Sequence, residues 1–232
     1  MGNGLRTLSI DIGGSGIKTF VLDEQGNPLT ERLREPTPEK PTPDAVLQVL
    51  SGLIDKQGEF DRISVGFPGV VRCGEIRSAV NLDPSWIGFN LADALSQALG
   101  KPTRVANDAD VQGLAAIEGK GVELVLTLGT GLGSALFTDG HLVPNLEMGH
   151  HPFRKGRTYE EYLGAASLEA KGKKKWNGYL QEAIVNLERL FSYRMLYLGG
   201  GNAKRIEIDL PPNATTVPNV TGLLGGIALW HD

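Results

Sequence analysis

The same order of elements occurs twice in this 232-residue chain, first from residue 8 and again from residue 124. In each copy an apolar segment carries a polar side chain near its end, Asp11 or Thr127, and a glycine-rich turn and a second apolar segment follow. Apolar segments joined in this way predict antiparallel strands. An acidic turn follows each returning strand, at Asp23 and at Asp139. We therefore expect two related lobes, each built around a β-meander.

The rest of the pattern mixes helices with strands, so the expected fold class is α/β with duplicated mixed sheets flanked by helices. Strands are predicted over residues 8–12, 17–22, 29–33, 63–67, 105–107 and 195–198, and helices over 44–56, 91–99, 109–118, 176–192 and 221–230. We place an N-terminal lobe at residues 1–106 and a C-terminal lobe at 107–232, with the last helix packing back on the first lobe. A cleft between two such lobes is a common location for a ligand site.

Composition narrows the class of protein further. The 31 glycines indicate either loose linkers or many backbone positions that need a positive φ or a close ligand. A net charge of −4 argues against a general nucleic-acid binder, and no apolar run is long enough for a membrane span. The single cysteine, Cys73, excludes an internal disulfide and a cysteine-based structural zinc site. Without a signal-peptide pattern, these features predict a cytoplasmic protein.

The two glycine turns are candidate phosphate sites. Backbone N–H groups with no neighbouring Cβ can converge on phosphate oxygens, and a lysine adds positive charge. Asp11, at a strand end beside such a turn, is suited to orient water around Mg²⁺. For each turn alone, a tight hairpin without a ligand is the alternative. The candidates are Gly13, Gly14, Ser15, Gly16 and Lys18 in the first turn, and Thr130 and Gly131 in the second.

Asn107 and Asp108 lie where a predicted strand passes into a helix. An aspartate there can cap the helix, and we expect Asp108 at the N-cap position. The same carboxylate can also take a proton from a substrate hydroxyl while Asn107 hydrogen-bonds the substrate. Capping and catalysis are compatible.

Three further groups of residues are candidates for binding a polyol or an anion. Glu147 and His150, with Glu160 or Glu161 shortly after, can contact sugar hydroxyls, and a solvated loop is the alternative. The run Gly199, Gly200, Gly201 and Asn202 favours close approach of a flat or anionic ligand over a flexible connection. Basic residues at 154–157 and 171–175, including Lys173 and Lys174, suit a long polyanion, although a charge run is usually a solvated face.

These motifs together resemble those of the ROK family of sugar kinases, within the larger group of actin-like, hexokinase-like and Hsp70-like folds. The resemblance rests on residues 11–18, 107–110, 127–133 and 198–203, in this order and over nearly the whole length. Residues 65–71, 81–89 and 144–150 resemble segments of polyphosphate glucokinases within that family. The resemblance implies a two-lobed, ribonuclease H-like fold. It also implies phosphoryl transfer from polyphosphate, with ATP as a further donor, to the 6-hydroxyl of glucose.

The resemblance also implies roles for individual residues. Asp108 would be the general base, Asp11 would hold Mg²⁺ through water, and the glycine turns with Asn202 and the lysines would bind the donor. Glucose would contact Asn107, Glu147, His150, Glu160 and Gly69. ROK kinases carry a cysteine-rich zinc motif before the later glutamate, and this chain lacks it, so Glu161 stays an alternative to Glu160.

We expect a homodimer acting on small molecules, with no nucleic-acid or membrane partner. An ATP-dependent hexokinase and a non-catalytic sugar sensor are the competing functions.

Overall fold

The computed structural model describes residues 4–79, 82–218 and 221–230. Asn81, at the start of one segment that resembles polyphosphate glucokinases, lies outside these residues. Contacts divide the chain into a first unit of residues 1–115 and 222–232 and a second unit of residues 116–221. Residues 107–115 thus belong to the first unit, whereas the sequence placed them in the C-terminal lobe. The reason is that residues 103–107 form a strand of the first sheet and the next helix packs on that sheet.

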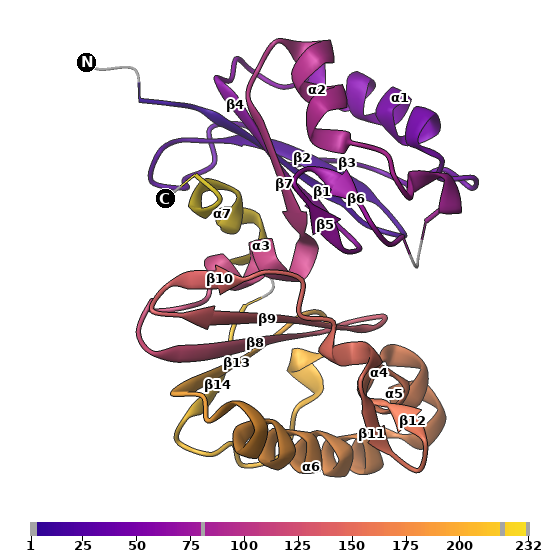
Figure 1. Cartoon of the computed structure of the whole chain (residues 1–232), viewed down its shortest axis with the longest axis vertical. Coiled ribbons are helices and arrows are strands. Elements are labelled where there is room, and N and C mark those ends of the chain that lie inside the picture. Colours follow the sequence, from indigo (N-terminus) through magenta and orange to yellow (C-terminus); the bar gives the residue numbers. More distant parts are fainter. Residues whose placement is uncertain (1–3, 80–81, 219–220, 231–232) are drawn as a thin grey trace. The chain divides into compact units, whose positions relative to one another are not determined.

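The first unit contains a mixed five-stranded sheet in the order β3-β2-β1-β4-β7 (Figure 1). Its strands are β1 (Thr7–Ile12), β2 (Ile17–Leu22), β3 (Leu33–Glu35), β4 (Arg62–Phe67) and β7 (Thr103–Asn107). Its helices are α1 (Pro43–Ile54), α2 (Leu91–Leu99), α3 (Asp108–Leu114) and α7 (Thr221–Ala228), and a small hairpin joins β5 (Val71–Arg72) to β6 (Glu75–Ile76). The first three strands are antiparallel, and β4 and β7 run parallel to β1.

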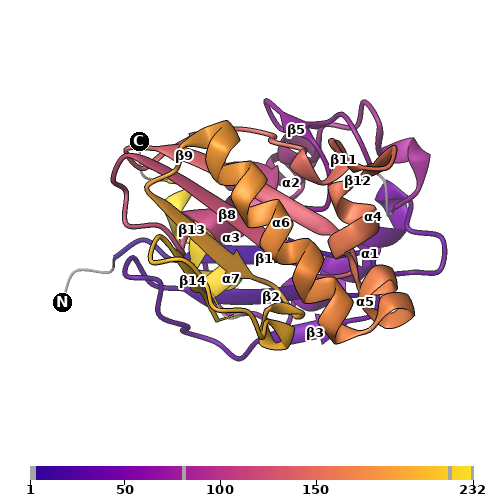
Figure 2. The ribbon, with the colours of Figure 1, turned by 90° about the horizontal axis from the view of Figure 1, so that it is seen from below.

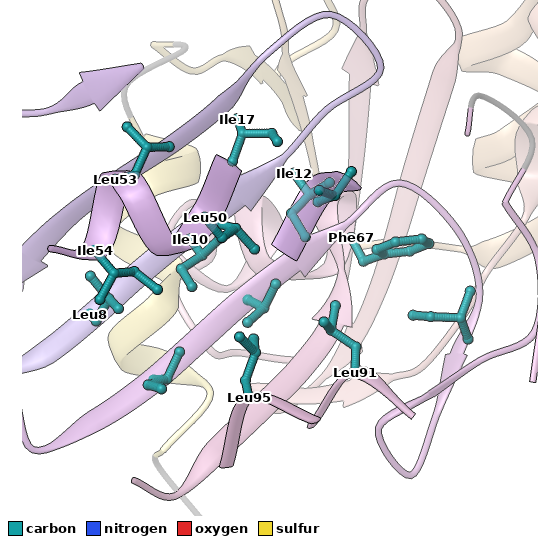
Figure 3. Packing of buried hydrophobic residues seen from close by; sticks show 14 of the residues in the cluster. Leu8, Ile10, Ile12, Ile17, Leu50, Leu53, Ile54, Phe67, Leu91 and Leu95 are labelled. Atoms are coloured by element: carbon teal, nitrogen blue, oxygen red, sulfur yellow. The ribbon is translucent and has the colours of Figure 1, made fainter. Parts of the chain in front are cut away.

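The two faces of this sheet have different chemistry because side chains alternate along a strand. Leucine, isoleucine, valine and phenylalanine side chains of β1 and β4 point toward α1 and α2 and form the apolar core (Figure 3). Small or polar residues lie on the other face and leave room for the glycines of α7. A Cβ on Gly226 would lie 2.8 Å from Ser9 Oγ, and the Ser64 hydroxyl donates a hydrogen bond to Gly226 O at 2.5 Å. Glycine therefore allows α7 to pack directly on the sheet.

The second unit repeats this strand order as β10-β9-β8-β13-β14. Its strands are β8 (Val122–Leu128), β9 (Leu132–Thr138), β10 (His141–Val143), β13 (Met195–Gly199) and β14 (Ala214–Thr216), and a hairpin joins β11 (Pro152–Arg154) to β12 (Arg157–Thr158). Its helices are α4 (Tyr159–Leu163), α5 (Ala165–Lys171) and α6 (Lys173–Phe191). Figure 2 looks onto α6, whose apolar side chains pack on the leucines of β8 and β13.

The duplication extends to individual positions. Asp11 pairs with Lys18 on the antiparallel neighbour and with Gly66 on the parallel neighbour. Thr127 pairs in the same way with Gly133 and Gly199. Each first strand thus has one antiparallel and one parallel partner and ends at a glycine turn. The predicted α/β class with duplicated mixed sheets is confirmed.

Two predicted elements differ from the structure by four residues at one end. The third strand begins at Leu33 rather than Leu29, because Thr30 Oγ1 accepts the Val21 N–H at 2.9 Å in place of a backbone carbonyl. The helix after β7 ends at Leu114 instead of residue 118. Beyond it the N–H groups of residues 118–120 bind the buried carboxylate of Glu123 at 2.7–3.0 Å, which turns the chain away from the helix.

Candidate active site

The first glycine turn is a closed hairpin whose carbonyl groups are held from outside the turn. The Gly13 N–H donates to Gly16 O at 3.0 Å, while Gly14 and Ser15 are exposed. Thr37 Oγ1 donates to Gly13 O at 2.5 Å and Arg34 Nη2 donates to Ser15 O at 3.1 Å. Two side chains therefore fix the turn and add a guanidinium to it.

Arg34 and Thr37 were not predicted as site residues, because no sequence motif marks residues about twenty positions beyond the turn. Gly16 has a local requirement that explains its identity. A Cβ there would lie 2.7 Å from Arg34 Nε. Only glycine lets the guanidinium lie against the turn.

Asp11 and Lys18 form an ion pair beside this turn. They are opposite each other in the register of β1 and β2, and Lys18 Nζ lies 2.6 Å from Asp11 Oδ2. Lys18 thus neutralises the carboxylate predicted to hold Mg²⁺, besides adding positive charge next to the turn. Mg²⁺ commonly binds one or two carboxylates together with waters and substrate phosphates. A single carboxylate at Asp11 fits that mode of binding.

Asn107, not Asp108, is the N-cap of α3. Its Oδ1 accepts the N–H groups of Ala109 at 2.8 Å and Asp110 at 3.3 Å, and its Nδ2 donates to Gly69 O at 3.1 Å. The predicted N-cap at Asp108 is therefore wrong by one position. The asparagine amide satisfies the helix terminus more fully, because it accepts two N–H groups and also anchors the loop after β4.

Asp108 is the first residue of α3 and is half-buried. Its Oδ1 also lies 2.8 Å from the Ala109 N–H. A carboxylate at this position is a candidate acceptor for the proton of a substrate hydroxyl. The cap does not depend on this side chain.

Asp11 and Asp108 lie at the same edge of the first sheet. Strands β1, β4 and β7 are parallel, and Asp11, Gly66 and Ala106 occupy one row of the register. Two strand spacings separate Asp11 from Ala106, or about 10 Å between backbones. The carboxyl edge of parallel strands is where ligands bind in open α/β sheets.

Gly69 belongs to the same edge through its carbonyl, which accepts the Asn107 amide. A Cβ on Gly69 would lie 2.1 Å from Ser78 O, so the loop after β4 can only fold with glycine here. The first unit therefore brings together Asp11, Lys18, Gly69, Asn107 and Asp108.

The second glycine turn is held by Glu160 from helix α4. Glu160 Oε2 accepts the Leu132 N–H at 3.0 Å, and a Cβ on Gly131 would lie 2.2 Å from that oxygen. The Ala165 N–H, at the start of α5, donates to the carbonyls of Gly129 at 3.0 Å and Thr130 at 3.1 Å. The turn is therefore built around a carboxylate, and Thr130 at its tip is exposed.

Glu160 and its neighbour Glu161 have different surroundings although both lie in the first turn of α4. Glu161 accepts the Thr158 N–H at 2.8 Å and forms a capping box with that threonine. Its carboxylate is therefore engaged with its own helix terminus. Glu160 alone of the two contacts the glycine turn, which makes it the better candidate for a ligand contact.

Glu147 and His150 flank the short 3₁₀ helix η2 (Met148–His150), with Glu147 Oε2 3.5 Å from His150 Nε2. Loss of solvation raises the pKa of Glu147 above its usual value. The charge of His150 opposes this rise, and the charge of Glu160 adds to it. The η2 backbone is fixed on β9 by the Met148 N–H, which donates to Ser134 Oγ at 3.1 Å. Helix α4, which carries Glu160, contacts η2, so Glu147, His150 and Glu160 come from adjacent elements.

The third glycine motif packs on the second glycine turn. Gly200 has φ +85°, and a Cβ on it would lie 2.4 Å from Leu128 O. Asn202 Nδ2 donates to Gly129 O at 2.8 Å and its backbone N–H donates to Leu128 O at 2.8 Å. Asn202 therefore braces the turn, while Gly201 is exposed at the surface.

The lysine run divides between two environments. Lys173 forms an ion pair with Glu207. Lys174 instead lines an open hollow of about 590 Å³, which we call the basic hollow. Its lining residues are Arg154, Lys171, Lys174, Lys175, Gly178 and Tyr179.

Within the described residues, no group of three or more histidine, cysteine, aspartate or glutamate side chains is arranged to hold a metal ion. No helix in that part of the chain is both long and apolar enough to cross a membrane.

Two sheets of one strand order, each with a glycine turn after its first strand, define the actin-like class that includes sugar kinases. The sequence profile of the ROK family matches residues 7–190. The chain belongs to the ROK family.

Three similar proteins have names that state an activity. Polyphosphate glucokinase of Mycobacterium tuberculosis is 34% identical over 234 residues, which cover 93% of this chain and 88% of that protein. Polyphosphate glucokinase of Mycobacterium leprae is 33% identical over 95% of this chain and 73% of its own length. The crystal structure of an inorganic polyphosphate/ATP-glucomannokinase from Arthrobacter sp. strain KM superposes with a TM-score of 0.86 at 35% identity, covering 98% and 100% of the two chains.

Proposed function

We propose that this protein is a polyphosphate-dependent glucokinase, which transfers a terminal phosphoryl group from polyphosphate to the 6-hydroxyl of glucose. The observation that carries the proposal is the 34% identity with a polyphosphate glucokinase over 93% of the chain. The similar Arthrobacter enzyme is a polyphosphate/ATP-glucomannokinase, which favours ATP as a second donor here. The terminal P–O bridge bond breaks, a bond from the glucose O6 to that phosphorus forms, and the O6 proton must be accepted.

In this reaction Asp108 accepts the proton of the 6-hydroxyl. Its place at the start of α3 supports this role, because the neighbouring Asn107 carries the cap of that helix. Asn107 Nδ2 carries two hydrogens and donates one of them to Gly69 O. The other hydrogen is proposed to donate to a sugar hydroxyl. The sugar hydroxyls are proposed to bind Glu147, His150 and Glu160.

The phosphate chain is proposed to bind the exposed N–H groups of the glycine turns, at Gly14 and Ser15 in the first and at Thr130 in the second. Lys18 and Arg34 add positive charge beside the first turn. Phosphoryl transfer needs alignment and charge neutralisation more than covalent help, so such groups supply most of what the reaction requires.

Mg²⁺ is the metal that this family of reactions implies, and Asp11 is the residue proposed to hold it through water. When bound, the ion neutralises charge on the transferred phosphoryl group. Lys18 keeps Asp11 Oδ2 oriented and partly neutralised at 2.6 Å. A homodimer and a cytoplasmic location remain predictions.

Asp108→Asn tests the assignment of the base. We expect kcat to fall by roughly 10² to 10⁴, with little change in the KM for glucose, because the substitution removes only the proton acceptor. Asp93→Asn is a matched control, since Asp93 lies in the first turn of α2 in the same unit. An Asp108→Asn protein with undiminished turnover would refute the role.

The donor is tested on the wild-type protein with glucose, Mg²⁺ and either polyphosphate or ATP. Product formation from polyphosphate is the expected result. Formation from ATP alone would identify an ATP-dependent hexokinase, and no formation from either donor would favour a sugar sensor.

A further inference from the structure

The β11–β12 hairpin joins two of the residues proposed to bind the sugar. His150 ends η2 just before the hairpin, and Glu160 lies in the first turn of α4 just after it. The strands are connected by a tight turn at residues 155–156, both of which have a positive φ. At the other end the Tyr159 N–H donates to His151 O at 3.1 Å. This bond closes the base of the hairpin.

His150 and Glu160 are each one residue from that closing bond. Their backbones are therefore held at a fixed spacing as long as the hairpin stays closed. The hairpin itself is weak, because its strands have three and two residues and its register is irregular. An isolated two-stranded hairpin is at best marginally stable in water. Side-chain packing from outside the hairpin must therefore keep it in place.

The ring of Phe153, in the middle of β11, supplies part of this packing. It stacks on the ring of Tyr159 with 4.5 Å between the centroids and 26° between the planes. It also makes a T-shaped contact with Tyr162 at 5.5 Å. Both tyrosines belong to α4, and Glu160 lies between them in the sequence. The ring thus ties the strand that follows His150 to the helix that carries Glu160.

Helix α6 anchors this arrangement to the rest of the unit. Tyr162 makes a T-shaped contact with Tyr179 of α6 at 4.8 Å. Arg154, the next residue of β11, forms an ion pair with Glu182 of α6 at 2.7 Å, and its guanidinium lies 5.4 Å from the centroid of the Tyr179 ring. Since α6 packs on the leucines of the second sheet, the hairpin is fixed to the core.

Fixed spacing of two sugar ligands has a direct effect on affinity. A binding site that must order its own segments when the ligand arrives loses part of the interaction free energy to that ordering. A site whose side chains are already held by packing avoids this cost. Contacts that hold the hairpin should therefore change the affinity for the sugar without touching it.

We propose that Phe153 is a positioning residue of the sugar site, which by stacking on Tyr159 sets the spacing of His150 and Glu160 before glucose binds. This inference rests on the proposed glucokinase function. In this scheme Phe153 contacts neither the sugar nor the reacting atoms. Its loss should therefore weaken glucose binding and leave the chemical step nearly unchanged.

Phe153→Leu tests the proposal, because leucine keeps an apolar side chain and removes both ring contacts. We expect the KM for glucose to rise by about 2- to 10-fold, which is the range that the loss of an aromatic pair gives. The kcat at saturating glucose should stay within about twofold. Phe153→Tyr keeps the ring and should restore the KM toward the wild-type value.

Phe191→Leu is the matched control. Phe191 is also half-buried against the core of the second unit, and it ends α6 about 13 Å farther along the helix than Glu182. The same substitution there should lower stability and leave the KM for glucose unchanged. Urea unfolding of each variant shows that the protein is folded under the conditions of the assay.

A double-mutant cycle with His150→Ala separates positioning from general destabilisation. If Phe153 acts by placing His150, Phe153→Leu should raise the KM for glucose by a smaller factor in the His150→Ala background than in the wild type. An equal factor in both backgrounds would overturn the proposal. An unchanged KM in Phe153→Leu would overturn it too, as would a rise of the same size in Phe191→Leu.

Calorimetric titration with glucose in the absence of any donor repeats the comparison on the dissociation constant. The same ranking of wild type and variants is expected, because the proposed effect is on binding. Wild-type protein that binds glucose but forms no product with polyphosphate or ATP refutes the proposed function. That outcome is distinct, since the titration still tests the role of Phe153.

Discussion

Replacing Gly131 by alanine should act on the sugar site through one displaced carboxylate. The added Cβ would lie 2.2 Å from Glu160 Oε2, and ordinary contact begins near 3.4 Å. The backbone of Gly131 does not have a positive φ, so alanine is compatible with the turn itself. The flexible end of Glu160 is the part that must move, by at least about 1 Å.

A movement of that size breaks the hydrogen bond from the Leu132 N–H to Glu160 Oε2, which is 3.0 Å long. Hydrogen bonds to charged groups contribute about 1.5 to 3 kcal/mol, and the partial exposure of Glu160 places this one near the lower end. If Glu160 also holds glucose, kcat/KM for glucose should fall by about tenfold or more. The free energy of unfolding should fall less, because alanine also restricts the unfolded chain.

A double-mutant cycle on kcat/KM for glucose isolates this cause. Gly131→Ala, Glu160→Ala and the double variant are compared with the wild type, and urea unfolding checks that each protein is folded. We expect Gly131→Ala to have almost no further effect once Glu160 is alanine, because the group it displaces is gone. An equal loss in both backgrounds would refute the reasoning and would assign the effect to phosphate approach at the turn.

Four further outcomes follow from the second unit. Glu161→Ala should reduce stability by about 0.5 to 2 kcal/mol through loss of its capping box and leave the KM for glucose unchanged. Gly200→Ala should lower the urea midpoint, because φ is +85° and the new Cβ would lie 2.4 Å from backbone Leu128 O. The raised pKa of Glu147 means that the folded state binds a proton more tightly than the unfolded state. The free energy of unfolding should therefore fall as pH rises from 4.5, the unfolded pKa, through the folded pKa. In Glu147→Gln, urea unfolding should show a weaker dependence of this free energy on pH over that range. Burial raises the pKa of Glu123, but hydrogen bonds from backbone N–H groups and from a tyrosine outweigh burial, so the pKa is lowered. The ionised carboxylate should therefore stabilise the fold above pH 4.5, and this stabilisation should be lost as pH falls through the folded pKa. Urea unfolding of the wild type and of Glu123→Gln at several pH values would show the difference.

Much of the fold could be predicted because it depends on local patterns. Helix α2 has its predicted bounds, Leu91–Leu99, since Asn90 caps its start and Gly100 ends it with φ 64°. The two meanders were predicted from alternating apolar segments and glycine turns. The hairpin of β11 and β12 was not predicted, because strands of three and two residues are too short to show a period.

Sequence by itself determined the duplicated architecture, the glycine turns and the resemblance to ROK kinases, because these depend on the order and spacing of residues along the chain. Tertiary structure decided which member of each adjacent pair takes which task. It places Asn107 at the cap and Asp108 beyond it, Glu160 against the glycine turn and Glu161 in a capping box, and Lys174 in the basic hollow and Lys173 on Glu207. Successive residues of a helix point about 100° apart, so neighbours of identical chemistry meet different surroundings that only the packing of other elements defines.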